Sequence, residues 1–114
     1  AWSMAVFRGR LFAGVLPSGR VKSIEAGKSA TSDVELPAGW VHLAAVKGSD
    51  RLRLYINGKQ VAVSSQFTAS KFNLSNKVPL TVGRGQHDHF NGSLSDVRIY
   101  RHALSDSEVK QISK

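Results

Sequence analysis

The chain has 114 residues, of which 41% are hydrophobic, so it can bury one hydrophobic core and is short for two. It contains no cysteine, which excludes a disulfide-stapled fold and a thiol nucleophile. The net charge is +8, and each half of the chain carries eight basic and four acidic residues. This even spread of charge permits weak attraction to polyanions. The sequence shows no basic tail and no recognisable nucleic-acid-binding motif.

The first part of the chain predicts β-hairpins. Residues 2–6 alternate large and small side chains, and Arg8-Gly9-Arg10 predicts a turn. Residues 11–16 and 21–26 then form two further candidate strands around the turn signal Pro17-Ser18-Gly19. Trp2 is expected to fill the core.

The next segments predict a loop and a buried strand. Residues 27–33 are polar and without period, as is typical of a surface loop. Residues 40–46 are apolar on both parities, which predicts a central strand covered on both faces. We therefore expect Trp40 to lie in the core and His42 to have a structural role.

Asn57-Gly58 stands between two alternating apolar runs and predicts a two-residue hairpin turn, because both turn positions need a positive φ. With Ile56 opposite Lys59, Tyr55 is expected to face Gln60. The further expected pairs are Leu54 with Val61, Arg53 with Ala62, Leu52 with Val63 and Arg51 with Ser64. This register predicts one apolar face and one polar face, the latter carrying Tyr55.

The C-terminal part predicts more strands and one helix. Residues 80–82 and 90–100 are candidate strands, and a bulge near Ser95-Asp96 would explain a break in alternation in the second. Ser105 and Glu108 form a capping box that starts a short amphipathic helix. Eight or nine short strands with frequent turns predict an all-β sandwich or barrel.

Four sequence pieces carry a family resemblance. They are Trp-Val-His-Leu-Ala-Ala-Val from residue 40, Leu-Arg-Leu-Tyr-Ile-Asn-Gly from 52, Leu-Thr-Val-Gly from 80 and Phe-Asn-Gly-Ser-Leu-Ser-Asp-Val-Arg-Ile from 90. In this order they resemble bacterial laminin G-like domains of the concanavalin A-like superfamily. The resemblance implies a jelly-roll sandwich of two antiparallel sheets with a short C-terminal helix. It also implies carbohydrate or protein binding in secreted or cell-surface proteins.

The resemblance also bears on domain organisation. We expect residues 1–114 to be one domain, and to be the C-terminal portion of a longer one, because such domains normally begin with additional strands. A sandwich without those strands would expose apolar sheet face and unpaired edges. We therefore expect self-association through sheet edges.

Catalysis is not expected. Laminarinase-type hydrolases that share this fold place closely spaced acidic residues on one strand, since retaining hydrolysis needs two carboxyls about 5–5.5 Å apart. Glu25 and Glu35 are isolated, and no Gly-x-Ser-x-Gly elbow surrounds a serine. The prediction is a non-catalytic, lectin-like accessory module of a larger extracellular protein. The alternative is a structural or adhesion module that packs against neighbouring domains and binds no free ligand.

Candidate ligand residues combine an aromatic ring with polar groups, as sugar binding requires. They lie on the polar hairpin face and in the loop after residue 83: Tyr55, Arg53, Arg84, His87, His89 and Asn91. A neighbouring strand could equally cover Tyr55.

Asp88 and Asp96 are the candidate metal ligands, because the resemblance implies calcium at the rim of the sandwich. Two alternatives remain for them. The cluster from His87 to His89 could bind a transition metal or be a solvated loop, and Asp96 could bond backbone N–H groups at the bulge.

Overall fold

The computed structural model describes residues 3–15, 17–85 and 87–114. The described residues form the following elements: β1 (Ser3–Phe7), β2 (Arg10–Val15), β3 (Arg20–Glu25), β4 (Leu43–Lys47), β5 (Leu52–Ile56), β6 (Lys59–Val63), the 3-10 turn η1 (Ala69–Lys71) and the helix α1 (Asp106–Ile112). The strands make two antiparallel three-stranded sheets, β1-β2-β3 and β4-β5-β6. The predicted all-β class with one closing helix is confirmed. Trp2 lies outside the described residues.

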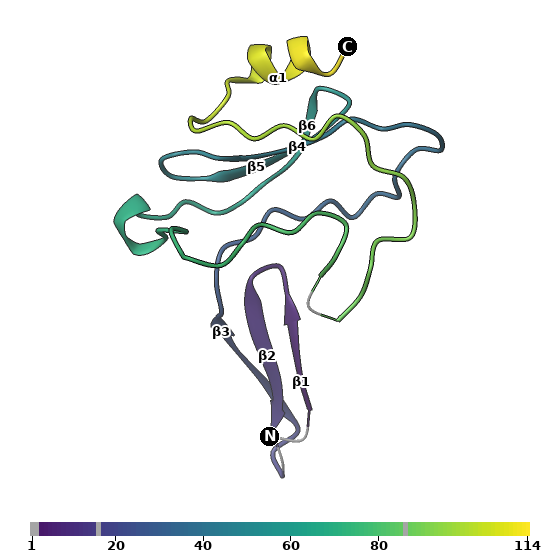
Figure 1. The fold of residues 1–114 in the computed structure, drawn as a ribbon. Coiled ribbons are helices and arrows are strands. Elements are labelled where there is room, and N and C mark those ends of the chain that lie inside the picture. The colour runs from purple at the N-terminus through teal and green to yellow at the C-terminus, as the bar shows by residue number, and fades with distance from the viewer. Residues whose placement is uncertain (1–2, 16, 86) are drawn as a thin grey trace.

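The first sheet follows the sequence pattern closely. Phe7 pairs with Arg10 across a two-residue turn, in which Arg8 has φ 49° and Gly9 has φ 77°. A Cβ on Gly9 would lie 2.5 Å from the carbonyl oxygen of Gly27, because the chain that leaves β3 crosses the turn there. Glycine is therefore required at position 9 for both its backbone angle and this close approach. Figure 1 shows this sheet projecting from the rest of the molecule.

The second sheet places β5 in the centre, between β4 and β6. The predicted strand over residues 40–46 is partly wrong, since β4 begins at Leu43 and lies at an edge of the sheet. Residues 80–82 and 90–100 are two further predicted strands. Neither is a strand in the structure. Asp96 has φ 54° at the predicted bulge, and this left-handed residue interrupts an extended conformation.

The β5–β6 hairpin confirms the predicted turn but shifts its register. Asn57 (φ 50°) and Gly58 (φ 80°) make the turn, and Ile56 pairs with Lys59 and Tyr55 with Gln60 as expected. Further along, an irregularity between Leu54 and Tyr55 changes the remaining pairs, so the predicted ones are wrong. The observed pairs are Leu54 with Ala62, Arg53 with Val63, and Leu52 with Ser64 through the Ser64 N–H and the Leu52 carbonyl (2.9 Å). One extra residue in β6 forms a bulge that no turn signal specifies.

The buried core lies where α1 covers the second sheet. Val46, Tyr55 and Val109 form the buried cluster, and Ala44 and Leu104 pack against it. The capping box is confirmed: Ser105 Oγ accepts the Glu108 N–H (3.3 Å), and Glu108 Oε2 accepts the Ser105 N–H (2.7 Å). The face predicted to be polar is therefore the one that holds the core, because the tyrosine ring buries its apolar body under the helix.

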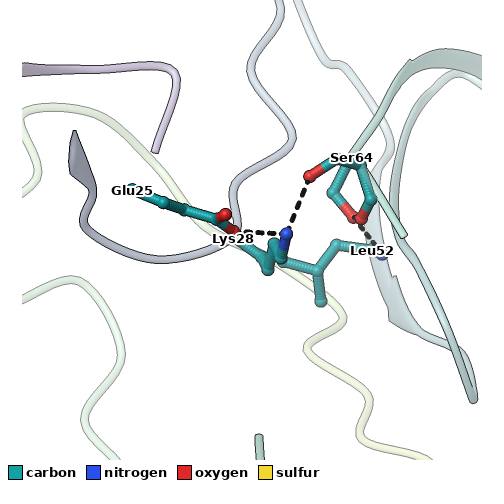
Figure 2. A network of polar contacts seen from close by, with 5 residues as sticks. Glu25, Lys28, Leu52 and Ser64 are labelled. Atoms are coloured by element: carbon teal, nitrogen blue, oxygen red, sulfur yellow. Dashed lines mark hydrogen bonds and ion pairs between the residues drawn. The ribbon is translucent and has the colours of Figure 1, made fainter. Parts of the chain in front are cut away.

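A polar link joins the segment after β3 to the end of β6. The Lys28 ammonium contacts the Glu25 carboxylate and donates to Ser65 Oγ (3.2 Å), while the neighbouring Ser64 Oγ accepts the Leu52 N–H (2.8 Å) (Figure 2). This contact lowers the pKa of Glu25, because the ammonium beside it stabilises the charged carboxylate. The radius of gyration is 17.0 Å, against about 13 Å for a compact domain of this length, so the two sheets are held in an open arrangement.

Candidate functional site

The predicted hairpin site is not exposed. Tyr55 is only 1% exposed, and its hydroxyl donates to the Asp106 carboxylate at the start of α1. Burial, together with Asp106, raises the pKa of Tyr55, so the phenol stays neutral. The expectation that Tyr55 forms an exposed sugar platform is wrong, and a helix rather than a strand covers it. Arg53 lies half-buried beside it on β5.

The predicted loop site is exposed, and backbone contacts link its two sides. Arg84 and His89 form an antiparallel bridge, the Gly85 N–H donates to the Asp88 carbonyl (2.7 Å), and the Phe90 N–H donates to the Gly83 carbonyl (2.8 Å). The side chains at the tip face solvent: His87, Asp88, His89 and Asn91. The structure thus brings Arg84 and His89 together but places them apart from the hairpin residues. Ligand binding by this loop stays a prediction.

The predicted calcium ligands do not form an oxygen cage among the described residues. Both carboxylate oxygens of Asp96 are engaged by the Arg98 guanidinium, at 2.9 Å to Nε and 3.0 Å to Nη2. Residues 3–15, 17–85 and 87–114 contain no group of three or more histidine or acidic side chains placed to hold a metal ion. Calcium takes six to eight oxygen ligands, and backbone carbonyls and waters are among them, so calcium binding by Asp88 and Asp96 stays a prediction.

A hollow among the described residues lies along the edge of β4, and we call it the aromatic groove. Its volume is about 1030 Å³, and its walls come from residues 36–47 and from the segment 83–104. Three exposed aromatic side chains line it: Trp40, Phe90 and Tyr100. Trp40 is 74% exposed, so its predicted place in the core is wrong. The turn residues Pro37-Ala38-Gly39 directly before it are the sequence signal that Trp40 lies ahead of the strand and not within it.

Polar groups stand beside these rings. The His102 ring meets Tyr100 edge to face at 6.2 Å between centroids, and Arg84 and the Asp96–Arg98 pair also line the groove. Hydrogen bonding to Asp96 raises the pKa of Arg98, which keeps the guanidinium charged. The aromatic groove therefore combines ring faces with hydrogen-bonding groups, the combination that sugars need.

His42 lines the aromatic groove and carries a buried polar atom. Its backbone is fixed by Asn57, whose side-chain oxygen accepts the His42 N–H (2.9 Å) and whose N–H donates to the His42 carbonyl (2.8 Å). Its Nδ1 atom is buried without a hydrogen-bond partner among the residues that the structure describes. Such an atom is costly unless a ligand or water pairs with it.

None of the described helices has the length and apolar character that a bilayer-spanning segment needs.

Three comparisons place the chain among known proteins. Residues 4–110 match the model of the concanavalin A-like lectin/glucanases superfamily, in its laminin G type. Pappalysin-1 of Mus musculus is 30% identical over 95 residues, which are 78% of this chain and 6% of that protein. A solved part of an S-layer domain-containing protein from Clostridium thermocellum ATCC 27405 superposes with a TM-score of 0.61 at 24% identity, covering 92% of this chain and 51% of that one. This last likeness shows the fold.

Proposed function

Because the chain belongs to the concanavalin A-like lectin/glucanases superfamily, we propose that it is a non-catalytic carbohydrate-binding module that uses the aromatic groove. The observation that carries the proposal is the presence of three exposed aromatic side chains, Trp40, Phe90 and Tyr100, in the lining of one hollow. Sugar rings present apolar faces to such side chains and hydroxyls to the polar groups around them. Arg84 belongs to the predicted loop site and also lines the aromatic groove, so the loop site and the groove share this residue.

The acidic groups of the groove support binding rather than hydrolysis. Asp96 is the one acidic residue among the described groove-lining residues, and Arg98 engages both of its oxygens. Glycoside hydrolysis ordinarily needs a pair of carboxyls, about 5–5.5 Å apart in retaining and about 6.5–9.5 Å apart in inverting enzymes. A single paired carboxylate does not supply this chemistry.

We propose further that the module belongs to a larger extracellular or cell-surface protein. The chain spans 6% of pappalysin-1 and about half of the solved part of the S-layer protein, so the matching segments of these relatives lie within longer chains. Membership in the laminin G type of this superfamily, which resembles domains of secreted and cell-surface proteins, supports this location.

Glycan binding by matched variants tests the proposal. The full chain is applied to a panel of neutral and acidic glycans, and the affinity for any bound oligosaccharide is measured for the wild type and for Trp40→Ala and Phe7→Ala. Phe7 is also an exposed ring (56%) but does not line the aromatic groove. We expect Trp40→Ala to lose about tenfold or more, because stacking on an aromatic ring contributes about 1–3 kcal/mol in comparable sites, while Phe7→Ala keeps the affinity. Equal affinities in both variants would contradict the proposed site.

The same panel tests calcium. Binding is measured with added calcium, with EDTA, and at two salt concentrations. Because Asp96 is engaged by Arg98, we expect EDTA to leave binding unchanged. A loss with EDTA would instead favour the predicted role of Asp88. Binding confined to polyanions and lost in salt would reduce the effect to the net charge of +8.

A structural or adhesion module is the second candidate, and the first sheet favours it. Met4, Val6 and Ile24 on this sheet are exposed, although their residue types are usually buried. Such surface packs against neighbouring domains or against a second copy. Sedimentation tests whether this surface packs against a second copy. Self-association at micromolar concentration supports such packing, whereas a clean monomer contradicts it.

A further inference from the structure

A second hollow lies along β6, at the edge of the second sheet opposite β4, and we call it the strand-edge groove. Its volume is about 660 Å³, and its walls are β6 and the segment 27–34. None of its lining residues also lines the aromatic groove. An inference about it therefore does not depend on sugar binding.

The first wall is an open strand edge. β6 pairs with β5 on one side only, and no backbone hydrogen bond from another described segment reaches residues 59–63 on the other side. An edge of this kind presents a row of unpaired N–H and C=O groups, which is the template for adding an extended peptide. β4, the opposite edge of the same sheet, faces the aromatic groove instead.

The second wall supplies side-chain hydrogen bonds. Ser29, Thr31 and Ser32 line it, and Ser29 Oγ is buried without a partner among the described residues. This wall is held at its start by the Gly9 carbonyl, which accepts the N–H groups of Ala26 (2.7 Å) and Gly27 (3.1 Å). The hydroxyls of Thr31 and Ser32, which are not buried, therefore offer hydrogen bonds beside the open edge of β6.

The lining distinguishes a peptide from a sugar. No aromatic ring is present among the described residues that line this groove, so they offer a sugar no face to stack on. A peptide backbone, by contrast, carries a donor and an acceptor at each residue and matches an open strand edge.

Charge at the rim distinguishes acidic from basic peptides. Arg8 and Asp33, which both line the groove, pair with each other, and Lys59 lies exposed at the start of β6 with no ion pair among the described residues. With the net charge of +8, the remaining field is positive and attracts carboxylates.

We propose that the strand-edge groove binds an extended, acidic segment of a protein partner, which adds to the second sheet as a strand beside β6. Backbone hydrogen bonds to β6 would supply the affinity, and Lys59 would favour an acidic residue in the segment.

Nuclear magnetic resonance of the ¹⁵N-labelled full chain tests this. The probe is an acetylated and amidated eight-residue peptide of alternating threonine and valine with two glutamates, and the comparison probe is the same peptide with alternate backbone amides methylated. We expect amide shifts at residues 27–34 and 59–63 with the first peptide and none with the second. Lys59→Glu should weaken binding about two- to fivefold, as one exposed charge pair does. The matched control is Lys71→Glu, an exposed lysine on η1 outside the groove.

Three results would overturn the proposal. They are equal shifts with the methylated peptide, shifts confined to other residues, and shifts of these same amides by oligosaccharides from the glycan panel. The last would assign this groove to a sugar. Loss of glycan binding in Trp40→Ala with unchanged peptide binding would separate the two sites.

Discussion

The two sheets of this chain share one local design and differ in what covers them. β1–β2 and β5–β6 are both closed by two-residue turns whose residues have positive φ, Arg8-Gly9 and Asn57-Gly58. The second sheet contains buried residues, because α1 packs on it and closes over Tyr55. No described residue of the first sheet is buried. Alternation and turn residues are therefore enough to form a hairpin, whereas burial needs a second element.

Replacing an aromatic ring in each sheet gives the largest expected effect. Tyr55→Ala should lower the free energy of unfolding by about 3–5 kcal/mol, because it empties a buried site under α1. Phe7→Ala removes a ring that is 56% exposed and should cost less than about 1 kcal/mol. Urea denaturation measures both. Equal losses would mean that the first sheet is buried in solution, by another copy or by rearrangement.

Adding a methyl group at a turn should have an intermediate effect. Gly58 has φ 80°, and a Cβ there would lie 2.5 Å from Ser113 Oγ and 3.1 Å from Lys110 Cα, because the hairpin turn packs on α1. We expect Gly58→Ala to lower the free energy of unfolding by about 2–3 kcal/mol. Gly19 has φ 64° with nothing within 4 Å, so Gly19→Ala should cost about 1 kcal/mol, from backbone strain alone. A larger loss at Gly19 would contradict the contact between turn and helix.

The smallest expected effect is the pH dependence at the cap of α1. The Ser105 N–H holds the pKa of Glu108 below its ordinary value of 4.5. The contribution of this carboxylate to stability is therefore present above pH 4.5 and is lost as the pH falls through the lowered pKa. Thermal unfolding at several pH values should show a shallower acid loss for Glu108→Gln than for the wild type. Glu35→Gln, at an exposed position without an ion pair among the described residues, is the control. An identical acid profile in Glu108→Gln would refute the cap's contribution.

Much of the candidate site could not be predicted from the sequence. The sequence predicts Trp40 in the core and leaves Tyr55 either exposed or covered by a neighbouring strand, whereas the structure exposes Trp40 and buries Tyr55 under α1. The sequence pattern around an aromatic residue on a strand is the same whether its side chain is buried or exposed. Alternation separates the two faces of a strand but does not say which face is covered. Arg84 was a predicted site residue and does line the aromatic groove, since its place in a polar loop was a local property.

The sequence by itself determined the local structure: two Xaa-Gly hairpin turns, the Ser105–Glu108 cap and the β class, which depend on backbone angles and hydrogen bonds within a few residues. Only the tertiary structure decided the register beyond Tyr55, the edge position of β4, and which face α1 covers. These features depend on contacts between segments far apart in the chain, such as the one between Tyr55 and Asp106, and no short pattern records such a contact.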